Sequence, residues 1–79
     1  MESNDKLRYQ IRLRGMDDIR EFVNEASHLE GKCELISGRY RVDAKSLISV
    51  FTLPIRGEMV VEVEQEQTEL PEQMQKFIL

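Results

Sequence analysis

The sequence predicts an α+β domain, an open-faced sandwich of a four-stranded antiparallel sheet with three helices on one face. Three observations lead to this prediction. Apolar and polar residues alternate within residues 6–14 and 59–64, as in half-buried strands. Apolar residues recur at helical spacing within residues 19–26, and glycine or proline separates the segments. The expected order is strand, helix, strand, strand, helix, strand, helix (βαββαβα), and the 79 residues are expected to form one domain over 1–79.

The first strand is expected to have one apolar and one basic face. Its inward residues are Leu7, Tyr9, Ile11 and Leu13. Its outward residues are Lys6, Arg8, Gln10, Arg12 and Arg14. Gly15 ends the strand, because glycine commonly interrupts such patterns.

The first helix is expected to begin at Asp17 or Asp18. Asp18 with Glu21 three residues later fits a capping box, which satisfies free backbone N–H groups at a helix start. The inward stripe of this helix is Ile19, Phe22, Val23 and Ala26. We expect the helix to end near Leu29, with Gly31 beyond it as a stop signal.

Two short strands are expected at residues 33–37 and 40–44. Gly38 lies between them and permits a tight turn, so the two strands should form a hairpin. Cys33 has no second ligand at metal-binding spacing, and we expect it to be a buried structural thiol.

A short second helix is expected to start at Ser46, which suits the N-cap position. Leu47, Val50 and Phe51 should face inward. The helix should end at Leu53-Pro54, because the residue before a proline is disfavoured in helical geometry.

The last strand and a last helix complete the pattern. Met59, Val61 and Val63 should face inward on the strand, and residues 65–68 should form a polar loop. Thr68 can cap the helix, with Pro71 in its tolerated first turn. The apolar stripe of this helix is Leu70, Met74, Phe77 and Ile78.

The composition limits the classes of partner. The formal net charge is -4, so neither nucleic acid nor an anionic membrane is an expected partner. No apolar run is long enough to span a bilayer. The single cysteine excludes an internal disulfide, and the first residues lack the pattern of a secretory signal. A cytoplasmic location is therefore expected.

No motif for catalysis, metal or cofactor binding is evident. The sequence contains neither a phosphate-binding glycine loop nor a Ser/His/Asp set, and no loop supplies convergent oxygens for a cation. An acidic run is expected to be a solvated face, and its members are Glu62, Glu64, Glu66, Glu69 and Glu72. We therefore expect no enzymatic activity, no metal and no cofactor.

One segment nevertheless resembles a known family. Asp43-Ala44-Lys45-Ser46-Leu47 resembles the regulatory serine region of HPr, the histidine-containing phosphocarrier family of the bacterial phosphotransferase system. Phe22-Val23-x-Glu25-Ala26 supports the resemblance, which extends from the first strand to the start of the last helix. It implies the open-faced sandwich that the periodicity also predicts.

The phosphate-accepting histidine of that family is absent. Where the family has a pattern like Gly-Leu-His-x-Arg-Pro, this chain has Gly15, Met16, Asp17 and Asp18, so these residues form a degenerate phosphate site. The two carboxylates repel an anion at the helix start. His28 is the only histidine, and it falls near the other end of the helix, which is unfavourable for phosphate.

The resemblance implies a regulatory protein rather than a phosphocarrier. Ser46 is the regulatory phosphorylation candidate, and Lys45, Leu47, Ile48 and Phe51 are candidates for partner binding. The implied partners are HPr kinase, Enzyme I or a transcriptional regulator. For the surface, the alternative is that only Ile48 is exposed while Leu47 and Phe51 belong to the core. For function, the alternatives are a phosphocarrier that uses another site and an interaction domain without phosphorylation.

Overall fold

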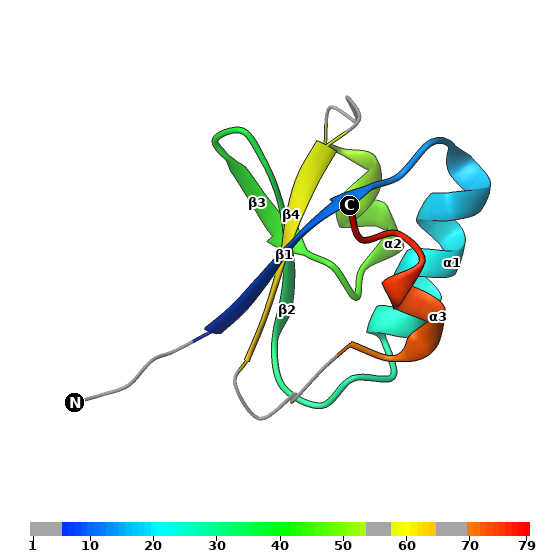
Figure 1. Cartoon of the computed structure of the whole chain (residues 1–79). Coiled ribbons are helices and arrows are strands. Elements are labelled where there is room, and N and C mark those ends of the chain that lie inside the picture. The colour runs from blue at the N-terminus through cyan, green and yellow to red at the C-terminus, as the bar shows by residue number, and fades with distance from the viewer. Residues whose placement is uncertain (1–5, 54–57, 65–69) are drawn as a thin grey trace.

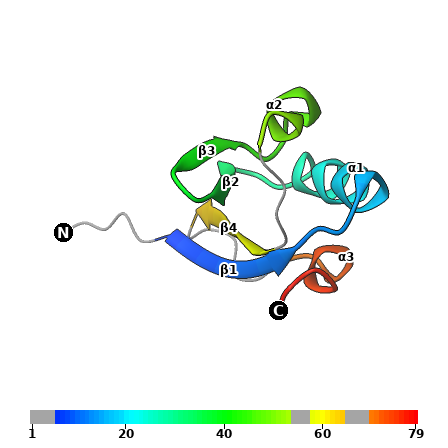
Figure 2. The ribbon, with the colours of Figure 1, turned by 90° about the horizontal axis from the view of Figure 1, so that it is seen from above.

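The computed structural model describes residues 6–53, 58–64 and 70–79. Its elements are β1 (Lys6–Arg12), α1 (Met16–Ala26), β2 (Cys33–Ser37), β3 (Tyr40–Asp43), α2 (Leu47–Phe51), β4 (Glu58–Glu64) and α3 (Glu72–Gln75). The strands form one antiparallel sheet in the spatial order β1-β4-β2-β3. The three helices lie together on one side of this sheet (Figure 1, Figure 2). The predicted α+β fold and its order βαββαβα are confirmed.

Alternation within the strands separates a helix-covered face from an open face. Strand β4 lies between β1 and β2, and Val61 pairs with both Tyr9 and Leu35. These residues point toward the helices together with Ile11 and Met59, and all except the half-buried Tyr9 are buried. The residues between them point to the open face, because side chains alternate along a strand.

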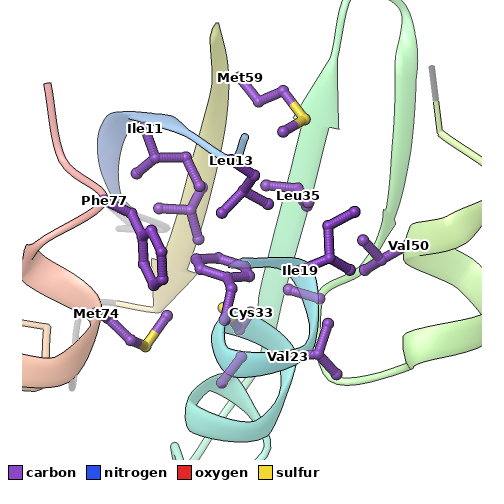
Figure 3. Packing of buried hydrophobic residues seen from close by; sticks show 14 of the residues in the cluster. Ile11, Leu13, Ile19, Val23, Cys33, Leu35, Val50, Met59, Met74 and Phe77 are labelled. Carbon is purple, nitrogen blue, oxygen red and sulfur yellow. The ribbon is translucent and has the colours of Figure 1, made fainter. Parts of the chain in front are cut away.

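The core fills the space between the sheet and the helices (Figure 3). Its largest fully buried side chains are Phe22, Ile11, Leu13, Leu35, Leu70 and Met74. The rings of Phe22 and Phe77 meet edge to face, with centroids 5.9 Å apart and planes at 76°. This contact attaches the C-terminal segment to α1. Each large side chain buried in this way stabilises the fold by about 1.5–3 kcal/mol.

The C-terminal residues also cover part of the outer edge of β1. The backbone N–H of Arg12 donates to the Phe77 carbonyl at 2.9 Å, and that of Leu79 donates to the Gln10 carbonyl at 2.9 Å. Ile11 and Ile78 form an antiparallel bridge between these two bonds. Edge strands are prone to unwanted pairing, and this short segment occupies one half of the β1 edge.

The ends of α1 differ from the prediction. Gly15 is the N-cap, so the capping box with Asp18 as the cap is wrong, and Asp18 lies in the first turn. The helix ends at Ala26 rather than near Leu29, although Leu29 is still buried under the following turns. Gly31 has φ of 79°, and an added Cβ there would meet the end of the Glu64 side chain. Glycine adopts this left-handed backbone without strain, so it is favoured at this position shortly before β2.

The other boundaries deviate less. Strand β3 ends at Asp43, one residue earlier than expected. Pro71 is the N-cap of α3 and therefore precedes the first turn instead of lying in it. Gly38 has φ of 62° in the β2–β3 turn, as a tight hairpin requires. Pro54 and residues 65–68, which include the expected cap Thr68, lie outside the described part of the chain. Within the described part, no helix is long and apolar enough to cross a bilayer.

Candidate functional site

Ser46 is the N-cap of α2, as predicted. Its backbone is extended, and its Oγ accepts a hydrogen bond from the Ser49 N–H at 3.2 Å. The approach to the cap is fixed by Asp43, whose Oδ1 accepts from the Lys45 N–H at 2.9 Å and whose carbonyl accepts from the Ser46 N–H at 3.2 Å. Ser46 is half-buried. The hydroxyl group is thus held at the start of α2.

The side chains of α2 divide into an inward and an outward set. Val50 is fully buried and Leu47 is half-buried against the core. Ile48 is 79% exposed and Phe51 is 42% exposed. The prediction that Phe51 faces inward is therefore wrong. On a helix, Phe51 is rotated by about 100° from Val50, and a helix of five residues buries only a narrow stripe.

Lys45 is not a free cation beside the serine. Its Nζ donates to the Leu29 carbonyl at 2.6 Å and so links the start of α2 to the chain that follows α1. Burial raises the pKa of the nearby Cys33 thiol to about 12, although the charge of Lys45 partly opposes this rise. Cys33 is therefore a protonated, buried thiol, in agreement with the structural role predicted for it.

The start of α1 has no side-chain cap. Met16 and Asp17 are exposed, and Asp18 Oδ2 accepts a hydrogen bond from the Arg14 N–H at 2.9 Å. This bond ties the residue before the N-cap to the first turn of the helix. His28 lies two residues beyond the end of α1 and is exposed. Its backbone N–H donates to the Glu25 carbonyl at 3.1 Å.

Cations near the start of α1 are largely paired. A depression of about 250 Å³ there is lined by Arg12, Arg14, Asp18, Lys76, Phe77, Ile78 and Leu79. Arg12 is paired with Glu58 at 3.3 Å, and Lys76 is paired with Glu21. Among the contacts of the described residues, the side chains of Arg12 and Arg14 do not pair with Asp17 or Asp18.

The ion cluster on the open face was not predicted. Glu62 is only 3% exposed, so its assignment to a solvated acidic face is wrong. Its Oε2 accepts from Arg8 Nε at 2.6 Å and its Oε1 accepts from Arg41 Nη1 at 2.7 Å, while Lys6 Nζ lies 3.7 Å from Oε1. The same Arg41 nitrogen also donates to Glu34 at 2.7 Å.

The cluster holds Glu62 in its charged form. Burial would raise the pKa of this carboxyl group, but hydrogen bonds from Arg41 and Arg8 outweigh burial and bring the pKa below its usual value. A buried charge is costly unless it is paired and hydrogen-bonded, as it is here. No local signal in the sequence predicts this burial, because Glu62 alternates with the inward residues Val61 and Val63 as a solvent-facing residue would.

The other acidic residues of the run differ in burial. Glu72 is exposed and Glu64 is half-buried, whereas Glu66 and Glu69 lie outside the described residues. Within the described ranges, no group of three His, Cys, Asp or Glu side chains is arranged to hold a metal ion.

Comparison with known proteins does not identify a family. No protein-family model matches the sequence, and no curated protein matches it significantly. The relation to HPr therefore stays a prediction, which depends on the segment around Ser46 and on the order of the elements.

Proposed function

We propose that this chain is a non-enzymatic regulatory module that binds other proteins through α2, similar to HPr-like proteins without the active histidine. One observation carries the proposal. The exposed side chains of Ile48 and Phe51 lie on a short helix whose first turn is fixed by the Ser46 cap and the Lys45–Leu29 bond. Apolar side chains held on a rigid element can serve as anchors for a partner. We place this activity in the cytoplasm.

Phosphorylation of Ser46 is proposed as the switch. A kinase would transfer the terminal phosphoryl group of ATP to Oγ, releasing ADP and the hydroxyl proton, and would replace a neutral cap by an anion. An anion is tolerated at a helix start because free N–H groups point toward it. It would lie at the start of the helix that carries Ile48 and Phe51, and near Asp43, so it would change the charge of the element that we propose for docking.

Phosphocarrier chemistry is less well supported than this regulatory role. The start of α1 offers Gly15 and Met16 in place of an acceptor, and the carboxylates of Asp17 and Asp18 in its first turn would repel a phosphate. His28 follows the carboxyl end of the helix, where the dipole disfavours an added phosphate. Enzyme I, HPr kinase or a transcriptional regulator remain the partners that the resemblance suggests.

The test is intact-mass spectrometry after incubation with ATP and an HPr kinase. The parent should gain the mass of one phosphoryl group, Ser46→Ala should gain none, and Ser49→Ala should behave as the parent. Ile48→Ser should slow the modification by about tenfold if α2 is the docking surface, because losing one apolar anchor costs about 1.4 kcal/mol or more. Tyr40→Ser removes an exposed apolar side chain elsewhere and should leave the rate unchanged.

The other outcomes would contradict defined parts of the proposal. A phosphoryl group on Ser46→Ala would place the modification at another residue. No gain on the parent would remove the switch and favour an interaction domain without phosphorylation. An unchanged rate for Ile48→Ser would remove α2 as the docking surface for the kinase.

A further inference from the structure

The open face of the sheet carries one cross-strand row without an acidic residue. Gln10 pairs with Val60, Val60 pairs with Ile36, and Ile36 pairs with Arg41, so these four residues lie side by side across the sheet. The other rows through β4 on this face each contain a glutamate, namely Glu58, Glu62 and Glu64. An apolar strip formed by Val60 and Ile36 therefore crosses an otherwise charged face.

This strip forms the floor of two adjoining depressions. The first has a volume of about 260 Å³ and is lined by Arg8, Tyr9, Gln10, Ile36, Arg41 and Val60. The second, of about 230 Å³, shares Gln10, Ile36 and Val60 with it. Among the described residues, arginine lines the first depression and not the second, so an apolar floor and two cations meet in the first.

Glu62 positions both arginines. Arg8 uses Nε and Arg41 uses Nη1 to bind the two oxygens of this buried carboxylate. Their side chains remain 64% and 46% exposed, so the other nitrogens of both guanidinium groups can reach a ligand. Because the carboxylate already orders these long side chains, binding a ligand would cost less side-chain entropy.

The charge of the cluster favours a single negative charge. Lys6, Arg8 and Arg41 contribute three positive charges, and Glu62 and Glu34 contribute two negative charges, which leaves one positive charge. A carboxylate matches the planar fork of a guanidinium group and has that charge. An anion without an apolar part would leave Val60 and Ile36 uncovered.

We propose that the depression between Arg8 and Arg41 binds a small organic acid, with its carboxylate on the two arginines and its short apolar body on Val60 and Ile36. This site lies on the open face of the sheet and does not depend on the proposed role of α2. Hexanoate is a suitable probe, because it combines one carboxylate with a short alkyl chain.

The test is a titration of the isotopically labelled protein with hexanoate, followed by NMR. Amide signals of Gln10, Ile36, Arg41 and Val60 should shift and saturate. Acetate lacks the apolar part and hexan-1-ol lacks the charge. Each should therefore bind at least about tenfold more weakly than hexanoate, since each loses about 1.4 kcal/mol or more of contact free energy. Shifts that are equal for hexan-1-ol and hexanoate, or no saturable shift at these residues, would overturn the proposal.

Variants distinguish this site from general charge effects. Arg41→Gln should weaken hexanoate binding by about tenfold, because a charge-assisted hydrogen bond is lost. Arg14→Gln removes the same charge from an exposed position outside the depression and should weaken it less than about twofold. Val60→Thr keeps the branched shape but replaces a methyl group, and it should weaken binding severalfold. Equal losses for Arg41→Gln and Arg14→Gln would refute the site, and Arg8→Gln provides the same test should Arg41→Gln fail to fold.

Discussion

The two faces of the sheet are built from alternate residues of the same strands, yet different interactions stabilise them. On the face covered by helices, Ile11, Leu35 and Val61 are completely buried among apolar side chains. On the open face, Arg8 and Arg41 converge on Glu62, which is almost as inaccessible as a core residue. One face excludes water with apolar side chains, and the other does so locally with charged ones.

The comparison shows that burial and apolarity are separate properties in this fold. The covered face gains stability from the removal of apolar surface from water, which does not depend on direction. The open face depends on geometry, because Glu62 is tolerated only where two guanidinium groups reach its oxygens at hydrogen-bond distance. Substitutions on the covered face should therefore act through volume, and those on the open face through charge.

The largest difference is expected between neighbours on β2. Leu35→Ala should lower the free energy of unfolding by about 2–5 kcal/mol, because it leaves a cavity in the core. Ile36→Ala, on the open face, should cost about 1 kcal/mol, because its side chain is only half-buried. Urea denaturation of both variants measures this difference. Equal losses would show that the open face is packed as a second core.

A smaller loss is expected when the cations of the open face are removed. The double variant Arg8→Gln with Arg41→Gln leaves Lys6 as the one cation near Glu62 among the described residues, and it should lose about 2–3 kcal/mol of unfolding free energy. Introducing Glu62→Gln into this double variant should recover about 1 kcal/mol or more, because a neutral amide needs no cation.

The control for this rescue removes two exposed arginines elsewhere. Arg14→Gln with Arg39→Gln changes the net charge equally but leaves Glu62 paired, so it should change stability by less than about 0.5 kcal/mol. Thermal or urea unfolding of the double and triple variants is the measurement. A triple variant no more stable than the double variant would show that the charge of Glu62 is not what the arginines compensate.

The sequence predicts the covered face better than the open one. Alternation and helical spacing identify Ile11, Phe22 and Val61 as inward residues, because one periodicity decides their direction. The same alternation shows that Glu62 points outward, but not that it is buried. Its burial requires β4 to lie between β1 and β2, with Arg41 reaching across from β3, and strand order and register are not encoded in a local pattern.

The candidate site around α2 shows the same limit. The Ser46 cap was predictable, because serine before a short apolar segment is a local signal. Helical spacing assigned Phe51 to the inward face while the resemblance assigned it to the partner-binding surface, and the sequence did not decide between them, because the exposure of Phe51 depends on how α2 packs on the rest of the fold. Lys45 is a candidate for partner binding in the sequence, but its bond to the Leu29 carbonyl depends on a contact between segments sixteen residues apart. Tertiary contacts, rather than local propensity, decide these features.

The smallest effect is expected in the response to acid. In the folded protein the pKa of Glu62 lies below the ordinary value of 4.5, so the unfolded chain takes up a proton first as the pH falls. The contribution of Glu62 is therefore fully present above about pH 4.5, and it is lost as the pH falls through the lower pKa of the folded state. Glu62→Gln should flatten the dependence of unfolding free energy on pH in this acidic range.

Glu58→Gln provides the matched control for the acid response. Glu58 lies on the same strand and face and is paired with Arg12, but its side chain is 59% exposed. Its substitution should leave the dependence on pH close to that of the parent, because solvent screens an exposed pair. Urea denaturation at a series of acidic pH values compares the three proteins. If the pH dependence of Glu62→Gln matched that of the parent, the ion cluster would not keep Glu62 charged in the folded state, and the contrast between the two faces would be one of packing alone.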